Sequence, residues 1–448
     1  MPEADLPFPL KHKKESPLNL LKVIAARISS VFRTRMALLR AMSLADQILF
    51  SAANFVLTLI LVRHFSDEKV EAYGIALFSV LILQGVQRTS YILQNAVLPA
   101  PIFRRRASRV LGQHLIFLVL LTLAVLLISS ALFLFPSGKD VWAILYATAA
   151  CAMIYMHLDF DRLCLIKHDR YFDSFIFSAL YFVLIASSFF AVSYLNMSFA
   201  ALMGVMVLYG AGKLFRLLFI VGLPDFFWGW TMFKKSIRTC FTGSILGILG
   251  WAGFASAPLF VLSAFAPSVQ SAAYVVTRSL LQPINVIARS LDVIDKNTFQ
   301  TGQGASLLHL KQILFRQLSI YAIFGAVTIV GTLLFGELAL HILYGEKYDD
   351  FHGILIGWAV FVSLMTVMFP LETALTKTGR IQAYNIWKLP AGVTGIILAV
   401  LLCPPFGASG AMAATIGGAI VCLGACLWLI RDVIRTPGAP LPGSLSGG

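Results

Sequence analysis

The sequence has little charge for its length. Of its 448 residues, 12% are aspartate, glutamate, lysine or arginine, and 21 residues are acidic. Soluble globular proteins average about 25% charged residues. Hydrophobic residues make up 58% of the chain, and the mean hydropathy is +0.83. This composition excludes an ordinary soluble domain and indicates a polytopic membrane protein.

The six cysteines supply no framework of disulfides or metal ligands. Five lie in or beside apolar stretches and Cys164 lies in a charged segment, unlike the pattern of small secreted domains. Cys422 and Cys426 would share a helix face, but no histidine or third cysteine completes a zinc set. No nucleophile and base, and no paired carboxylates, stand at a catalytic spacing. We therefore expect no metal, no cofactor and no enzyme activity.

Apolar runs of about 20 residues, each long enough to cross the hydrocarbon core of a bilayer, recur twelve times. The expected fold class is an all-α polytopic membrane protein with about 12 transmembrane helices, six in each half. A basic arm (1–41), a first half (42–221), a linker (222–236), a second half (237–431) and a flexible tail (432–448) divide the chain. The twelve runs lie near residues 42–62, 72–96, 111–135, 141–160, 172–194, 198–221, 237–262, 270–295, 313–336, 353–375, 383–403 and 409–430.

Lysine and arginine gather in alternate connections between these runs. The connections rich in basic residues include those with the arginines at 104–106 and the lysines at 234–235, whereas the intervening connections carry few basic residues. Because positive residues are retained on the cytoplasmic side, we expect both termini in the cytoplasm. The net charge of +14 then reflects topology, and no nucleic-acid partner is expected.

The basic arm has a helical pattern near its end. Apolar residues recur at helical spacing between Leu18 and Arg40, with basic residues among them. This pattern is typical of a helix that lies on the inner leaflet and is attracted to anionic lipids. A disordered basic tail is the alternative interpretation.

The polar residues of the eighth run, Tyr274 to Asp295, are not scattered. At about 100° per residue, five of them fall within an arc of about 80° on one helix, so that one face is polar and cationic. These five are Arg278, Gln282, Asn285, Arg289 and Asp292.

The second run, Tyr73 to Asn95, has the same design. Its polar residues Gln84, Arg88, Tyr91 and Asn95 fall within about 60° of one another on a regular helix. Arg289 stands 201 positions after Arg88, and Asn285 stands 201 positions after Gln84. An arginine inside a membrane costs about 2.5–3.5 kcal/mol on insertion scales, so it normally faces a water-filled cavity or a partner. The matched pair favours two related helices that line one shared cavity.

Two alternatives remain open for each arginine. It forms a structural ion pair, with Asp46 or Asp292 for example, or its long side chain reaches the interface. Asp46 and Arg88 both fall in the cytoplasmic third of their spans, where they are close enough in depth to pair. Asp46 then has one of two roles. In a functional role it carries a coupling proton or adjusts the charge of Arg88, and in a structural role it only neutralises that arginine.

Several segments resemble a known family. They are EAYGIALFSVLILQG at the entry of the second run, LYGEKYDDF before the tenth, ALTKTGR after it, and PFGASGAMAATIGGAIV at the start of the twelfth. Their order and spacing resemble the Wzx-type polysaccharide flippases of the multidrug, oligosaccharidyl-lipid and polysaccharide exporter superfamily. The likeness covers residues 42 to 431.

This resemblance implies a V-shaped protein of two pseudo-symmetric six-helix lobes around a central cavity. It also implies a function, the transfer of an undecaprenyl-diphosphate-linked oligosaccharide across the bacterial inner membrane by alternating access. The cationic cavity residues of the family correspond to Arg88, Arg278 and Arg289. Planar guanidinium groups suit a diphosphate because they offer bidentate bonds, and Gln84, Gln282 and Asn285 would bind sugar hydroxyls.

Three functions are compared on this basis. The leading hypothesis is the flippase for exopolysaccharide, O-antigen or capsule assembly. Its partners would be the lipid-linked oligosaccharide, membrane lipids, and a polysaccharide polymerase with chain-length or export machinery. The alternative is a toxin-extrusion-type cation or drug antiporter, whose cavity should be acidic. A membrane-embedded polymerase or ligase is the third, and it requires a larger outer loop than the sequence has.

Overall fold

A computed structural model describes residues 35–96, 98–133, 140–240, 244–288, 291–292 and 307–435. The described chain is built of helices, as predicted. Among these residues, eight helices are long and apolar enough to cross a membrane, or nine when a bent pair is counted as one span. The prediction of a multi-pass, all-helical membrane protein is confirmed. The basic arm before residue 35 and the tail after residue 435 lie outside the described residues.

The first half of the chain forms an N-terminal lobe. Two of its helices contain a π-helical turn, here η1 and η2, in which the chain makes a wider loop than in an α-helix. The elements are α2 (Arg35–His64), α3 (Asp67–Gln87), η1 (Arg88–Ile92), α4 (Leu93–Ala96), α5 (Ala100–Phe133), α6 (Val141–Cys151), η2 (Ala152–Met156), α7 (His157–Lys167), α8 (Tyr171–Leu195) and α9 (Phe199–Val221).

The second half forms a C-terminal lobe, preceded by the helix α10. The last helix, α17, consists of two arms, because Gly407 has a left-handed φ of 54° at a kink, a conformation that glycine adopts without strain. The predicted eleventh and twelfth spans are these two arms. The elements are α10 (Phe226–Cys240), α11 (Leu246–Ala255), α12 (Ala257–Phe265), α13 (Ser268–Leu280), α15 (Leu307–Tyr344), η4 (Glu346–Phe351), α16 (His352–Lys377) and α17 (Ile381–Arg435).

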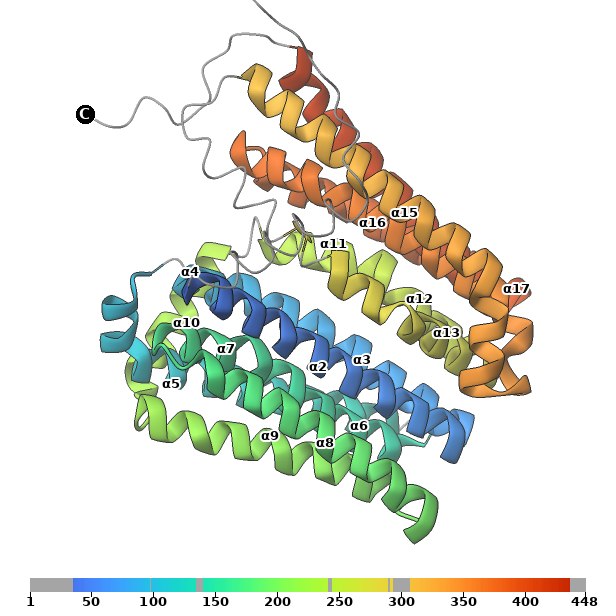
Figure 1. Ribbon diagram of the computed structural model, residues 1–448, viewed down its shortest axis with the longest axis horizontal. Helices are drawn as coiled ribbons and strands as arrows, with labels where there is room; N and C mark the ends of the chain where they lie inside the picture. Colours follow the sequence, from blue (N-terminus) through green and yellow to red (C-terminus); the bar gives the residue numbers. More distant parts are fainter. Residues whose placement is uncertain are drawn as a thin grey trace, which may run out of the picture.

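Figure 1 shows the two lobes as separate layers of long helices, which meet at one end and diverge toward the other. We call the end with the connections at 98–100, 168–170, 222–225 and 378–380 the basic end. The opposite end, where Ser66 and Gly345 lie, is the far end. The lobes meet at the far end, in agreement with the expected two-lobe architecture.

The segment between the lobes is more ordered than a linker. Its helix α10 packs against α5 of the N-terminal lobe, with the ring of Phe233 edge-on to that of Phe117. A Cβ on Gly229 would lie 2.6 Å from the backbone nitrogen of Gln113, so the two helices touch through their backbones. The linker therefore extends the N-terminal lobe by one surface helix.

Polar side chains join the lobes at the far end. Arg63 of α2 donates to the carbonyls of Ile342 and Leu343 at the end of α15, over 3.0 and 2.9 Å. On the turn that follows, Lys347 lies 2.7 Å from the carboxylate of Asp67, and Tyr348 donates to the same carboxylate over 2.8 Å. Because free carbonyls at a helix C-terminus attract cations, the arginine suits its site. These contacts hold the far end closed.

Deeper in the protein, α3 and α13 touch where Gly74 meets Val275. A Cβ on Gly74 would lie 2.3 Å from Cγ2 of Val275. We expect Gly74→Ala to destabilise the closed far end by about 1–3 kcal/mol, the usual cost of overpacking. Hydrogen exchange of the amides around Ser66 should accelerate, and Val275→Ala in the same chain should restore protection. Unchanged exchange in Gly74→Ala would contradict a tight contact between the lobes here.

Candidate functional site

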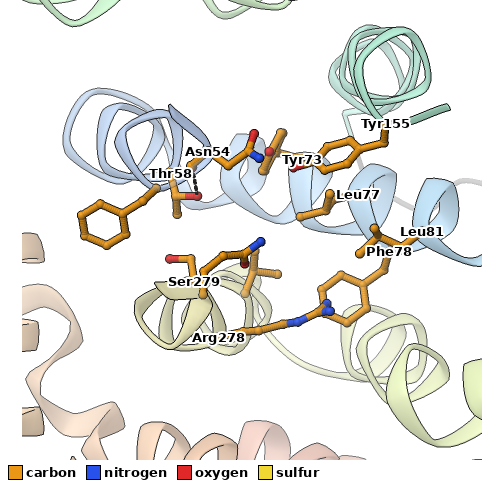
Figure 2. A pocket seen from close by; sticks show the side chains of 12 residues that line it. Asn54, Thr58, Tyr73, Leu77, Phe78, Leu81, Tyr155, Arg278 and Ser279 are labelled. Carbon is orange, nitrogen blue, oxygen red and sulfur yellow. Dashed lines mark hydrogen bonds between the residues drawn. The ribbon is translucent and has the colours of Figure 1, made fainter. Parts of the chain in front are cut away.

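A pocket lies between the lobes, behind the contact of Gly74 with Val275. Side chains of α2, α3 and η2 line it from the N-terminal lobe, and side chains of α13 and its following turn line it from the C-terminal lobe. Its cavity volume is about 40 Å³, within about 490 Å³ of space free of atoms that includes open solvent. Figure 2 shows Arg278 and Ser279 on one wall and Asn54, Thr58, Tyr73 and Leu77 on the other.

Arg278 supplies the charge of this pocket. Its guanidinium carbon lies 4.2 Å from the ring centroid of Phe78 on α3 and 5.5 Å from that of Trp358 on α16. Aromatic faces attract a guanidinium through their quadrupole, so the two rings hold the charge in place between the lobes. Figure 2 shows Arg278 beside the ring of Phe78. None of the twelve lining side chains is acidic. The pocket is therefore suited to an anion.

Ten residues separate Arg278 from the start of α13, which is about 15 Å along a helix. The guanidinium thus lies well inside the lobe contact, closer to the far end than Arg88 is. Apolar side chains form part of the remaining lining, among them Leu77, Leu81 and Val275. A hydrocarbon chain could occupy such a wall while a charged head group bound Arg278.

The predicted polar face of the eighth span is only partly formed. Gln282 lines the pocket with Arg278, whereas Asn285 is half-buried and is not among the lining residues. The helix is not continuous, since α13 ends at Leu280 and Leu281 forms a turn. Pro283 explains the break, because proline has no N–H to donate and disfavours helical geometry in the preceding residue. Arg289 lies outside the described residues, and Asp292 is buried.

The predicted face of the second span also changes direction, because the π-helical η1 begins at Arg88. Gln84 donates to the carbonyl of Tyr155 and lies 3.3 Å from a carboxylate oxygen of Asp159. It therefore binds inside the N-terminal lobe and is absent from the pocket lining. Arg88 is exposed, in accord with an accessible cation at the basic end. Tyr91 is fully buried and does not share the face of Arg88.

Asp46 does not pair with Arg88. Its carboxylate lies 2.6 Å from the guanidinium of Arg162 on α7, and it accepts a hydrogen bond from Ser178 on α8. The side chain of Asp46 is 4% exposed and that of Arg162 is 21% exposed. The structure thus corrects the expected partner and gives Asp46 a structural ion pair within the N-terminal lobe.

A second buried ion pair was missed by sequence analysis. Asp161 on α7 binds Lys213, at 3.3 Å, and Arg216, both on α9. The sequence around Asp161 has mixed charges, a pattern that is typical of a solvated connection. In the structure it is the helix α7, and the Asp161 side chain is 2% exposed. Helical spacing of Asp161 after His157 is the signal that favours a helix here.

The C-terminal lobe contains a third pair. Lys388 at the start of α17 lies 2.9 Å from Glu372 on α16, and its ammonium lies 4.4 Å from the ring centroid of Tyr384. Sequence analysis placed no cation in the eleventh span, although Lys388 is within it. Because a carboxylate and an aromatic ring hold the ammonium of Lys388, we infer that this residue stabilises the packing of α16 against α17.

Comparisons of the structure with solved structures place this fold among membrane transporters. The lipid II flippase MurJ, in an inward closed conformation, has a TM-score of 0.68 at 13% sequence identity, over 88% of this chain and 87% of that one. An inward-facing multidrug resistance MATE family transporter of the MOP superfamily has a TM-score of 0.62 at 15% identity, over 86% and 94%. A P26A mutant of MATE has a TM-score of 0.60 at 15% identity, over 91% and 98%.

Comparisons of the sequence itself give no match, either to a protein-family model or to a curated protein. At 13–15% identity the structural similarity shows the fold alone. The chain thus has the two-lobe fold shared by these MOP-superfamily transporters, and both a flippase and multidrug transporters are similar to it.

Proposed function

We propose that this protein is a flippase that moves a lipid-linked oligosaccharide diphosphate across the inner membrane of a bacterium. The observation that carries the proposal is the pocket between the lobes, which has one guanidinium, amides and hydroxyls, apolar walls and no carboxylate. A lipid diphosphate has the matching parts, namely a charged head, sugar hydroxyls and a hydrocarbon chain. The similarity to a lipid II flippase supports the same class.

The electrostatics of the transfer favour arginine at this position. A diphosphate must pass through a region of low dielectric constant, where an unpaired charge is costly. Arginine keeps its charge there and binds phosphate oxygens through two parallel N–H groups. Arg88 is exposed nearer the basic end and Arg278 lies nearer the far end, so the head group would pass from the first arginine to the second as the lobes rock.

In this proposal the basic end faces the cytoplasm, since lysine and arginine are concentrated there. Both chain ends would lie on the same side. The contacts at the far end described above then close the pocket toward the outer side. A polysaccharide polymerase with its chain-length or export machinery would use the product on the other side.

A cation or drug antiporter is the second candidate, because multidrug MATE transporters are also similar in structure. Such a protein attracts cations, and a pocket with Arg278 and no carboxylate repels them. An enzymatic function would require a nucleophile and base or paired carboxylates in the pocket, and its lining residues do not provide them. We therefore favour transport of an anionic lipid.

A complementation experiment tests the proposal. The chromosomal gene is deleted, and surface polysaccharide and lipid-linked intermediates are measured with the wild type and with an Arg88→Ala/Arg289→Ala variant. We expect deletion to remove the polymer and trap intermediates in the inner leaflet. The wild type should restore export, whereas the double variant should reach the membrane and fail. Unchanged polymer with greater sensitivity to cationic drugs would support the antiporter instead.

A further inference from the structure

Two histidines form a buried chain of hydrogen bonds in the N-terminal lobe, apart from the pocket. His114 on α5 and His157 at the start of α7 are both 0% exposed, and Nε2 of His114 lies 2.9 Å from Nδ1 of His157. Nδ1 of His114 lies 2.8 Å from the hydroxyl of Tyr91 and 2.9 Å from the amide nitrogen of Gln87. Nothing in the proposed transfer of substrate uses these side chains.

A backbone carbonyl determines which ring nitrogens carry protons. The Gln87 amide nitrogen donates to the carbonyl of Met156 over 2.9 Å, which fixes the orientation of the amide. The second hydrogen of this amide faces both the Tyr91 hydroxyl, at 2.7 Å, and Nδ1 of His114, at 2.9 Å. With the proton of the neutral ring on Nε2, Nδ1 accepts from the amide or from the hydroxyl. That proton is donated to Nδ1 of His157, whose own proton is therefore on Nε2. Both rings are neutral, and each acceptor nitrogen is already occupied.

The end of this chain is unusual. Nε2 of His157 has no hydrogen-bond partner among the described residues. A buried polar atom of this kind requires an explanation, and proton chemistry is one. The chain also joins the two π-helical turns, since Tyr91 belongs to η1, and Met156 belongs to η2. Turns of this type occur often at functional sites.

We propose that His114 and His157 form a proton-binding site that is coupled to anion binding at Arg88. A proton from solvent forms a bond with the lone pair of Nδ1 on His114, and the site gains one positive charge. The Gln87 amide can no longer donate to that nitrogen, so it releases His114 and keeps its bonds to the Tyr91 hydroxyl and the Met156 carbonyl. The hydroxyl of Tyr91, 2.8 Å away, accepts the new N–H bond. Gln87 directly precedes Arg88, so the released residue adjoins the proposed substrate residue.

The surroundings determine the direction of the coupling. Lys213 on α9 and Asp161 on α7 act electrostatically on His157, and Asp159 on α7 acts on Tyr91. Lys213 and Arg216 bind Asp161, and Asp159 accepts a hydrogen bond from Gln84, so these two carboxylates already have partners. The added charge raises the positive potential around Arg88 and favours an anion there. By reciprocity, a bound anion must favour the proton. This inference rests on the proposed function, because that function supplies the anionic ligand at Arg88.

The experiment uses the whole protein in nanodiscs, with its eight histidines labelled with carbon-13 for magnetic resonance. His114→Gln and His157→Gln identify the two signals and remove titration while retaining polar side chains. His64→Gln is the matched control, because His64 is exposed near the far end. We expect the pair to take up a proton as the pH is lowered. Added undecaprenyl diphosphate should move its midpoint upward.

Lipid affinity gives the second measurement. We expect undecaprenyl diphosphate to bind roughly tenfold more tightly at low than at high pH, because the added positive charge attracts the diphosphate. This dependence should persist in His64→Gln and disappear in His114→Gln and His157→Gln. The inference is overturned if neither signal titrates, or if the pH dependence persists in both variants. Failure to bind the lipid at any pH would refute the proposed function instead, since the titration is measured without lipid.

Discussion

Replacing Arg278 with alanine should weaken the binding of a polyprenyl diphosphate by about 2–3 kcal/mol, or roughly 30- to 150-fold. Arg278 supplies the charge among the twelve lining residues of the pocket, and Phe78 and Trp358 hold it in place. A phosphate that loses this partner regains no equivalent bond, because the neighbouring groups are amides, hydroxyls and hydrocarbon. Binding of undecaprenyl diphosphate to the purified protein, with export in the complementation assay, measures the effect.

Two further variants separate charge from geometry. Arg278→Lys keeps the charge but loses the bidentate fork, so its affinity should lie between those of the wild type and Arg278→Ala. Arg109→Ala removes a cation that is 44% exposed and lies beside Asp225 outside the pocket, so it should bind as the wild type does. Equal affinities in Arg278→Ala and the wild type would remove the pocket from the proposed path.

The helical spans were predictable because their signal is local. A run of about 20 apolar residues has few stable forms in a bilayer other than a helix, and the predicted runs coincide with helices wherever the structure describes them. Arg278 and Gln282 were also predictable, since they are a turn apart and both line the pocket. Local spacing is sufficient for such statements, because no distant partner is needed.

Departures from the regular helix could not be predicted in the same way. The polar face of the second span was calculated for a regular helix, and η1 adds a wider turn at Arg88. Gln84, in the regular part of α3, binds Tyr155 and Asp159, far along the chain. In the eighth span, Pro283 was visible in the sequence. The calculation of the polar face assumed a regular helix and did not include the break that a proline causes, which lies at Leu281 in the structure.

Partners distant in the sequence were the other limit. Asp46 and Arg162 are 116 residues apart, and no pattern along the chain connects them. The spacing of residues placed Asp46 at the same depth in the membrane as Arg88. Several cations share that depth, and the packing of α2 against α7 and α8 determines which of them binds Asp46. The same limit applies to Asp161, whose partners are on α9. Depth in the membrane follows from sequence, whereas pairing follows from the arrangement of helices.

Replacing Asp161 with asparagine should destabilise the N-terminal lobe by about 3–5 kcal/mol, the usual effect of breaking a buried ion pair. The carboxylate holds Lys213 and Arg216, whose side chains are 5% and 13% exposed. Asparagine has nearly the same shape but no charge, so two buried cations lose their counter-ion. Thermal unfolding of the detergent-purified protein should show a lower midpoint.

Two controls determine whether charge is the cause. Asp225→Asn changes a carboxylate that is 32% exposed and 3.9 Å from Arg109, so the expected loss is below about 1 kcal/mol. Asparagine at 225 can still accept the hydrogen bond from the Trp228 amide, which leaves charge as the variable.

Lys213→Met added to Asp161→Asn removes one unpaired cation and should recover part of the loss in the unfolding midpoint. If the double variant is less stable than Asp161→Asn, unpaired charge does not explain the loss.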